Sequence, residues 1–414
     1  MCDTRHDDRD AMNPAGVARA IPVAEAVGMV LAHDVTEIRK DEFKGPAFRK
    51  GHVIRSEDIC HLQRIGKERL FVLSLGPDDV HEDDAAVALS RALMGEGVAV
   101  KGEPREGKIT IVASRDGLLK VDQERLKSFN MLGDVMCATM HTNTVVKKGQ
   151  EVAGTRAIPL VVKKDIIEKA VRSAECGVRN GGVISVKELR KPKAGVVITG
   201  NEVYHGRIKD AFAPIIAKKI EEYGGEIVGA YYAPDDERFI EDRLLELLNA
   251  GADLLITTGG MSVDPDDVTR FAIRSIGATD ITYGSAVLPG AMVLVGYLEN
   301  GGHGDTGTRG QGEEKNSDEK SGHGDTGTRG HGEQNNFANN GVDVSPRRRV
   351  AASPIPVLGI PACGMYHRTT VFDLILPRIL SGEHVGREAL AEFGHGGLCL
   401  HCTECRYPVC PFGK

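Results

Sequence analysis

One stretch of the sequence combines glycines, hydroxyl groups and carboxylates at a spacing that suits phosphate binding. Residues 252–269 read ADLLITTGGMSVDPDDVT. The apolar run 254–256 predicts a central parallel strand that is buried on both faces. Gly259 and Gly260 follow the strand, where glycines let backbone amides approach a ligand, and a helix opening near Pro265 would direct free N–H groups to the same space. The stretch therefore predicts an anion-binding loop, and an ordinary strand-to-helix turn is the structural alternative.

Carboxylates stand directly beside this loop, at Asp264, Asp266 and Asp267. A carboxylate and a phosphate repel each other, so a site that holds both usually needs a divalent cation between them. If a phosphate binds in this loop, the carboxylates therefore predict a divalent cation beside it.

Strands and helices alternate between about residues 191 and 385, which predicts an α/β domain with a mostly parallel sheet covered by helices on both faces. The elements expected are strand 196–199, helix 211–223, strand 226–232, helix 236–249, strand 254–257, strand 292–297 and strand 356–360. The first strand ends in the residues TGNE, and Asp210 is the expected cap of the first helix. Both glycine-containing strand ends would open on one edge of the sheet, where such folds bind ligands.

Residues 21–190 have a different pattern, with short strands, turns and few long helical repeats, and predict a β-rich α+β region. The elements expected here are strands 69–75, 108–113, 134–138 and 160–162 and a helix over residues 56–65. The loop His141-Thr142-Asn143-Thr144 would face a ligand at a domain junction, although a plain hairpin loop is the simpler interpretation.

The composition excludes two classes of partner. The chain has 414 residues, a formal net charge of −7 and a pI near 6.1, so no electrostatic case for nucleic-acid binding exists. No run of about eighteen apolar residues predicts a membrane span, and the charged residues 1–20 predict a flexible tail in a cytoplasmic protein. Residues 299–350 contain a near-identical repeat, GHGDTGTRG from Gly302 and again from Gly322, which predicts a disordered insertion.

Residues 386–414 form a cysteine-rich tail with the spacing C-x2-C-x2-C-x4-C. The four cysteines are Cys399, Cys402, Cys405 and Cys410. Thiolates this close together are natural ligands for Zn²⁺ or for an iron–sulfur cluster, and a closed set of four favours zinc. Free thiols are the alternative.

Five segments occur in the order used by the molybdopterin-binding domain of molybdenum-cofactor biosynthesis proteins. They are TGNEVYHGRIKDAF from Thr199, PDDE from Pro234, TGGMSVDPDDVT from Thr258, VLPGAM from Val287 and IPACGMYHRT from Ile360. This half of the chain resembles that family, and within it most closely the molybdopterin molybdenumtransferase branch, which includes MoeA and the E domain of gephyrin. The whole chain resembles bacterial molybdopterin-binding proteins that carry a cysteine-rich tail.

The resemblance implies an enzyme that binds molybdopterin or adenylylated molybdopterin and inserts molybdate, or tungstate, with Mg²⁺-dependent release of AMP. It implies catalytic roles for Glu202, Asp210 and Asp267. The residues implied to contact the substrate are Thr199, Gly200, Asn201, Thr258, Gly259, Gly260, Met261, Ser262, Asp264, Pro289 and Gly290. It also implies a homo-oligomer and, as a further partner, a molybdoenzyme that receives the cofactor.

The chain departs from the transferase pattern at three places. Asn201 stands where TGDE has a carboxylate, Ala291 stands where PGKP has a lysine, and residues 361–364 read PACG in place of PGNP. Two alternatives therefore stay open. One is a non-catalytic carrier or sensor of molybdopterin, and the other is a nucleotide pyrophosphatase, because DDVT at Asp266 is similar to the nucleotide-binding domain of competence-damage proteins.

Overall fold

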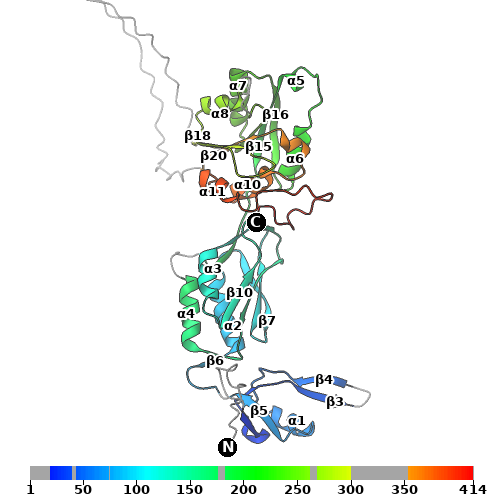
Figure 1. Ribbon diagram of the computed structural model, residues 1–414, viewed down its shortest axis with the longest axis vertical. Coiled ribbons are helices and arrows are strands. Elements are labelled where there is room, and N and C mark those ends of the chain that lie inside the picture. Colours follow the sequence, from blue (N-terminus) through cyan, green and yellow to red (C-terminus); the bar gives the residue numbers. More distant parts are fainter. Residues whose placement is uncertain are drawn as a thin grey trace, which may run out of the picture.

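The computed structural model describes residues 19–39, 43–73, 75–175, 182–261, 268–299 and 353–413. Figure 1 shows three lobes that follow one another in chain order along the long axis of the molecule. Residues 1–18 and 300–352 lie outside the described part, so most of the predicted N-terminal tail and nearly all of the predicted insertion are not described. No helix among the described residues is both long and apolar enough to cross a membrane.

The first lobe is small and consists mainly of antiparallel strands. Its elements are β1 (Arg19–Pro22), η2 (Val23–Glu25), β2 (Val30–Leu31), β3 (Val35–Arg39), β4 (Phe43–Phe48), α1 (Asp58–Arg64) and β5 (Arg69–Leu73). Strand β5 pairs with β1 on one side and β2 on the other, and β3 pairs with β4. The strand and the helix predicted here are confirmed, and Gly66 ends the helix region with φ 77°.

The middle lobe packs three helices against antiparallel sheets (Figure 1). Its strands are β6 (Asp79–His81), β7 (Val98–Arg105), β8 (Lys108–Ala113), β9 (Gly117–Val121), β10 (Val135–Thr139), β11 (Val145–Val146), β12 (Glu151–Ala157), β13 (Val161–Lys163) and β14 (Ile184–Lys187). Its helices are α2 (Glu82–Leu93), α3 (Gln123–Asn130) and α4 (Lys164–Glu175).

The β-rich character predicted for this half of the chain is confirmed, but helices α2 and α4 were not among the elements predicted from the sequence. Helix α2 buries alanine and leucine residues in one hydrophobic cluster with the sheet, and α4 contributes Ile167, Ala170 and Ala174 to the same cluster. Alanine-rich helical faces give a weak signal in the sequence because each small side chain buries little apolar area. Such a helix becomes evident only when it is packed against its sheet.

The third lobe is the predicted α/β domain. A six-stranded sheet has the order β16-β15-β17-β20-β19-β18, in which β16 (Glu226–Ala233), β15 (Lys193–Thr199), β17 (Leu254–Thr258) and β20 (Ile355–Ile360) run parallel. Strand β19 (Leu294–Leu298) is antiparallel to β20, and β18 (Thr279–Tyr283) is antiparallel to β19. All five residues of β17 are buried, as expected for a central strand.

Helices cover both faces of this sheet (Figure 1). One hydrophobic cluster includes residues of α6 (Phe212–Glu221), α10 (Val371–Leu380) and α11 (Arg387–Glu392). The other includes residues of α7 (Glu237–Asn249) and α8 (Thr269–Ser275). Two short helices, α5 (Asn201–Tyr204) and α9 (Cys363–Tyr366), directly follow β15 and β20. The fold class predicted for this part of the chain is confirmed.

Candidate functional site

Strand ends at one edge of the α/β sheet bring the predicted ligand-binding residues together. The parallel strands β15 and β17 end at Thr199 and Thr258. In the sheet register Thr258 is paired with Ile198 of β15 and with Ile360, where β20 ends. The backbone N–H of Gly259 donates to the carbonyl of Ile360 across this edge at 3.4 Å. Residues separated by more than 150 positions in the sequence therefore meet at the edge predicted for ligand binding.

The double-glycine turn after β17 fits only residues without a side chain. Gly259 and Gly260 have φ values of 79° and 56°, in the left-handed region. A Cβ atom at Gly259 would lie 2.7 Å from the carbonyl oxygen of Thr199, and one at Gly260 would lie 2.2 Å from Oγ1 of Thr269. The two glycines thus bring the backbone into close contact with the neighbouring strand end and with the start of α8.

Three threonine hydroxyl groups lie buried under this turn. Oγ1 of Thr199 donates to the carbonyl of Thr258 at 2.7 Å and lies 3.2 Å from Oγ1 of Thr269. Oγ1 of Thr258 is buried and has no hydrogen-bond partner among the described residues. A buried hydroxyl without a partner costs free energy, so this group marks a place where a further polar partner would be favourable.

The TGNE segment links two neighbouring strand ends. The N–H of Asn201 donates to a carboxylate oxygen of Asp235 at 3.1 Å, and the N–H of Asp235 donates to the side-chain oxygen of Asn201 at 3.3 Å. The exposed Glu202 folds its carboxylate back toward Gly200, where a Cβ would lie 2.9 Å from Oε1. Asn201 therefore fastens the loop after β15 to the loop after β16, a structural role that an amide fulfils well.

Asp210 caps α6, as its position in the sequence predicts. Its two carboxylate oxygens accept hydrogen bonds from the N–H groups of Phe212 at 2.8 Å and Ala213 at 3.0 Å. The hydroxyl of Tyr232 also donates to this carboxylate, at 3.3 Å. The pKa of Tyr232 is raised by partial burial and by the charge of Asp210. The structure thus gives Asp210 a capping role, and its catalytic role stays a prediction.

Two further groups of predicted ligand residues lie packed inside the domain. Pro289 and Gly290 are buried against α10, and a Cβ at Gly290 would lie 2.4 Å from Cγ1 of Val371. Met261 is only 2% exposed and packs within the cluster on the α7 and α8 face, while its carbonyl accepts a hydrogen bond from Tyr283. The Met261 side chain is therefore a core residue, and any ligand contact from it would come through its backbone.

Ser262, Asp264, Asp266 and Asp267 lie outside the described residues. Within the part of the chain that the structure describes, no three histidine, cysteine, aspartate or glutamate side chains are grouped closely enough to hold a metal ion. The magnesium site predicted beside the glycine turn consequently stays a prediction.

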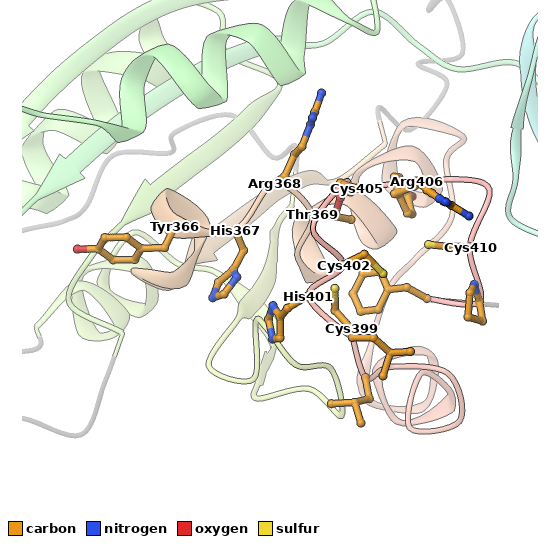
Figure 2. Close-up of a pocket in the computed structure, with 15 residues that line it drawn as sticks. Tyr366, His367, Arg368, Thr369, Cys399, His401, Cys402, Cys405, Arg406 and Cys410 are labelled. Atoms are coloured by element: carbon orange, nitrogen blue, oxygen red, sulfur yellow. Dashed lines mark hydrogen bonds between the residues drawn. The ribbon is translucent and has the colours of Figure 1, made fainter.

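The C-terminal cysteines gather around one cavity (Figure 2). The cavity has a volume of about 260 Å³ and includes all four cysteines of the tail in its lining. His367 and His401 also line it, with ring centroids 4.8 Å apart. The sequence motif therefore corresponds to a common location in space, although the four side chains do not form a closed ligand cluster.

The thiol of Cys405 differs from the buried cysteines of the chain. A hydrogen bond with Thr369, with sulfur and oxygen 3.3 Å apart, lowers the pKa of Cys405, and a backbone N–H of Tyr407 and the charge of Arg368 act in the same direction. Burial instead raises the pKa of Cys363 in the turn after β20, and it raises the pKa of Cys137 to about 12. Among the described cysteines whose pKa shift has a direction, Cys405 is the one whose pKa is lowered.

A second cavity, of about 520 Å³, lies between the middle lobe and the α/β domain. The middle lobe contributes Asn143 and Thr144, and the α/β domain contributes the cations Lys218 and Arg368 among others. The His141–Thr144 loop thus does reach a domain junction. Lys218 could not be singled out from the sequence, because a lysine on an amphipathic helix is typical of any solvated helix face.

Comparison with known proteins assigns the α/β domain to a family. Residues 195–379 match the family model described as "Probable molybdopterin binding domain". The chain therefore contains a molybdopterin-binding domain, and the resemblance inferred from the sequence motifs is confirmed at this level. The narrower resemblance to the molybdenumtransferase branch is not shown. Residues 20–74, the first lobe, match a family described only as a domain of unknown function.

Curated relatives and solved structures match smaller parts of the chain. A CinA-like protein of Mycobacterium avium is 40% identical over 77 residues, which are 19% of this chain and 18% of the relative. The CinA-like protein of Mycobacterium tuberculosis is 39% identical over the same length. The matched segment thus spans about a fifth of these relatives.

Among solved structures, the tungsten cofactor synthesizing protein MoaB of Pyrococcus furiosus is 29% identical, with a TM-score of 0.20 over 21% of this chain and 53% of that chain. The protein CinA of Thermoplasma acidophilum is 26% identical, with a TM-score of 0.21 over 22% of this chain and 54% of that chain. TM-scores this low add nothing to the argument for fold or function.

Proposed function

We propose that the α/β domain binds molybdopterin or its adenylylated form at the strand-end edge and acts in the synthesis of the molybdenum or tungsten cofactor. The observation that carries this proposal is the double-glycine turn after β17, together with the molybdopterin-binding family match of the same domain. Backbone amides held open by glycines suit the phosphate of a pterin ligand. The hydroxyl of Thr258, which has no hydrogen-bond partner within the described part of the chain, adds a polar group at the same place.

The proposed reaction is the Mg²⁺-dependent hydrolysis of the adenylyl phosphoanhydride of adenylylated molybdopterin. Water would supply the new P–O bond as AMP leaves and molybdopterin keeps its phosphate, and molybdate would lose one oxygen as water while the two dithiolene sulfurs bind molybdenum. Mg²⁺ would neutralise the phosphates as the bond breaks, and preorganised backbone donors would stabilise the developing negative charge. Glu202 and Asp267 are the proposed metal-binding carboxylates, with Asp210 in support. Thr199, Gly200 and the Pro289-Gly290 loop would surround the ligand.

A non-catalytic carrier or sensor of molybdopterin is the second candidate. Two observations favour it: Asn201 is engaged with Asp235, and both oxygens of Asp210 already accept backbone hydrogen bonds. A site of this kind binds a phosphate through its backbone but has fewer free carboxylates for a metal ion. A nucleotide pyrophosphatase is the third candidate function, and the sequence similarity to CinA-like proteins supports it.

One experiment separates the three functions. The purified chain is incubated with adenylylated molybdopterin, Mg²⁺ and molybdate, and pterin binding, AMP release and activation of a cofactor-free molybdoenzyme are all followed. AMP release with activation supports the transferase, and AMP release alone supports the pyrophosphatase. Tight binding without AMP release supports the carrier, whereas absence of any pterin binding contradicts all but the pyrophosphatase.

The catalytic residues are tested with a matched helix-cap control. Asp267→Ala and Asp210→Ala should each reduce AMP release by at least tenfold, since each removes a carboxylate from the proposed metal site. Asp236→Ala removes the cap of α7, where the carboxylate accepts from the N–H of Phe239 at 2.8 Å. This control loses about 1 kcal/mol of stability, as Asp210→Ala does, but should keep its turnover. Equal turnover in all three variants would remove the catalytic assignments.

A further inference from the structure

The tail after α11 has almost no secondary structure of its own. Residues 397–413 contain no helix and no strand beyond a single bridge between Leu398 and Leu288. Few backbone hydrogen bonds hold the tail, among them Cys399 N–H to Leu288 at 2.8 Å and Gly413 N–H to Gly396 at 2.9 Å. Phe412 is nevertheless buried in the core cluster of α10, so the far end of the tail is anchored.

The four tail cysteines are free and accessible. None of them is in a disulfide, and Cys402 is exposed while Cys399, Cys405 and Cys410 are half-buried. All four line the same cavity, which opens between the tail and the residues after β20 (Figure 2). Thiols directed to one cavity in reduced form are the donor set that soft and borderline metal ions prefer.

The spacing of the cysteines allows them to meet at one point. A chain spans at most about 3.5 Å per residue, so successive cysteines of the motif lie within about 10 to 18 Å even when extended, and turns bring them closer. Zinc–thiolate bonds are about 2.3 Å long. Because few backbone hydrogen bonds fix the tail, the side chains can close around an ion without loss of a helix or strand.

We propose that Cys399, Cys402, Cys405 and Cys410 bind one Zn²⁺ ion and that this ion fastens the tail to two loops of the α/β domain. Each thiol loses its proton to solvent as its sulfur bonds to the metal, so binding is coupled to a local ordering of the tail. No three of these side chains are grouped closely enough in the described residues to hold an ion, so binding requires the tail to rearrange.

The two loops are those that the tail already touches. Leu288, which exchanges backbone hydrogen bonds with Gly397 and Cys399 at 2.8 Å each, directly precedes Pro289 and Gly290. On the other side, Thr369 contacts Cys405, and the hydroxyl of Tyr407 donates to the carbonyl of Asp373 at 3.1 Å. A metal at the cysteines would thus brace the loop before β19 and the start of α10 from the same side.

The first test measures the metal content of the full chain, purified under reducing conditions after expression with added zinc. About one zinc ion per chain is expected, and Cys402→Ser should reduce it at least fivefold. Cys60→Ser is the matched control, because Cys60 is an exposed free cysteine of α1, and it should keep the full zinc content. Full zinc content in Cys402→Ser, or no zinc in the wild type, would overturn the proposal. Iron and sulfide in place of zinc would overturn the choice of metal.

The second test asks whether the ion orders the tail. Trypsin cleavage after the tail residue Arg406 is followed by mass spectrometry with and without a zinc chelator. Cleavage at this site should become at least tenfold faster after chelation in the wild type, and it should be fast in Cys402→Ser with or without the chelator. An unchanged cleavage rate would contradict the bracing role. Neither test involves a pterin ligand, so both outcomes are independent of the proposed function.

Discussion

The strand-end edge and the cysteine tail are both parts of the α/β domain, but they are held in place in opposite ways. At the edge, backbone atoms of different strands lie in direct contact, with Gly260 against Thr269 and Thr199 bonded to Thr258. In the tail, regular backbone pairing is nearly absent, and side chains make the main contacts. The described backbone of the edge is therefore fixed by contacts between strands, whereas the tail would gain its order from the proposed crosslink between side chains.

This difference bears on what each region can do. A preformed backbone site binds its ligand without an ordering cost, which favours affinity for a small phosphate-bearing molecule. A tail that orders only with its metal gains stability from that metal and loses it on chelation. The edge should thus be sensitive to added volume, and the tail should be sensitive to the loss of donor atoms.

The largest expected effect is that of added volume at the edge. Gly260→Ala should lower the free energy of unfolding of the α/β domain by about 3 kcal/mol, because of the left-handed φ and the overlap with Thr269. Gly251→Ala is the control, with φ 90° and no atom within 4 Å of the added carbon, and should cost about 1 kcal/mol. Denaturant unfolding measures both. Equal losses in the two variants would mean that the edge is not tightly packed.

We expect the pH dependence of the free energy of unfolding to come from Glu82 in the middle lobe, and not from the strand-end edge or the cysteine tail. This side chain is only 3% exposed, and burial together with the charge of Asp83 raises its pKa to about 7. A carboxyl group with a raised pKa in the folded state contributes full stability below its unfolded value, near 4.5, and loses it as the pH rises to about 7.

The loss across this range amounts to at most about 3 kcal/mol. Glu82→Gln should therefore flatten the dependence of unfolding free energy on pH between 4.5 and 7, as measured by denaturant titrations at several pH values. Asp84→Asn, which changes an exposed acidic residue of the same helix, serves as the control. A slope that survives in Glu82→Gln would assign the pH dependence elsewhere.

A smaller effect is expected from the buried hydroxyl that joins β15 to β17. Thr199→Ala removes the hydrogen bond to the carbonyl of Thr258 and should lower the free energy of unfolding by about 1 to 2 kcal/mol. Thr199→Ser keeps the hydroxyl and should recover more than half of that loss. If serine and alanine destabilise equally, packing of the methyl group matters more than the hydrogen bond.

The smallest effect concerns a single hydrogen bond of the tail. Tyr407→Phe removes the donor to the carbonyl of Asp373 and should cost about 1 kcal/mol, detected as faster proteolysis of the tail in the metal-free protein. Tyr366→Phe is the control, because Tyr366 lines the same cavity but is 78% exposed. In the zinc-bound protein the difference between the two variants should shrink, since the ion holds the tail instead.

The sequence was a good guide wherever the local pattern and the final environment agreed. Strands β15, β17, β19 and β20 are mostly buried apolar runs, so these strands, the cap at Asp210 and the glycine turns follow from patterns within about ten residues. Strand β18 has mostly polar residues and was not predicted, and the order of the strands in the sheet was not predicted either. Helices α2 and α4, whose buried faces consist largely of small residues, were not predicted from the sequence. Their stability comes from packing on a sheet whose strands are distant in the sequence. The same holds for the core position of Met261, which nothing in its own segment distinguishes from a ligand contact.

The sequence by itself determined the mostly parallel sheet, the glycines at its strand ends and the set of four cysteines, because each of these features depends on residue types and short spacings along the chain. Only the tertiary structure decided that Asn201 pairs with Asp235, that the cysteine tail lies against the loop before β19, and that Asn143 shares a cavity with Lys218. Those contacts join segments that are far apart in the sequence. They form only when the whole domain folds, so the conformational preferences of neighbouring residues do not reveal them.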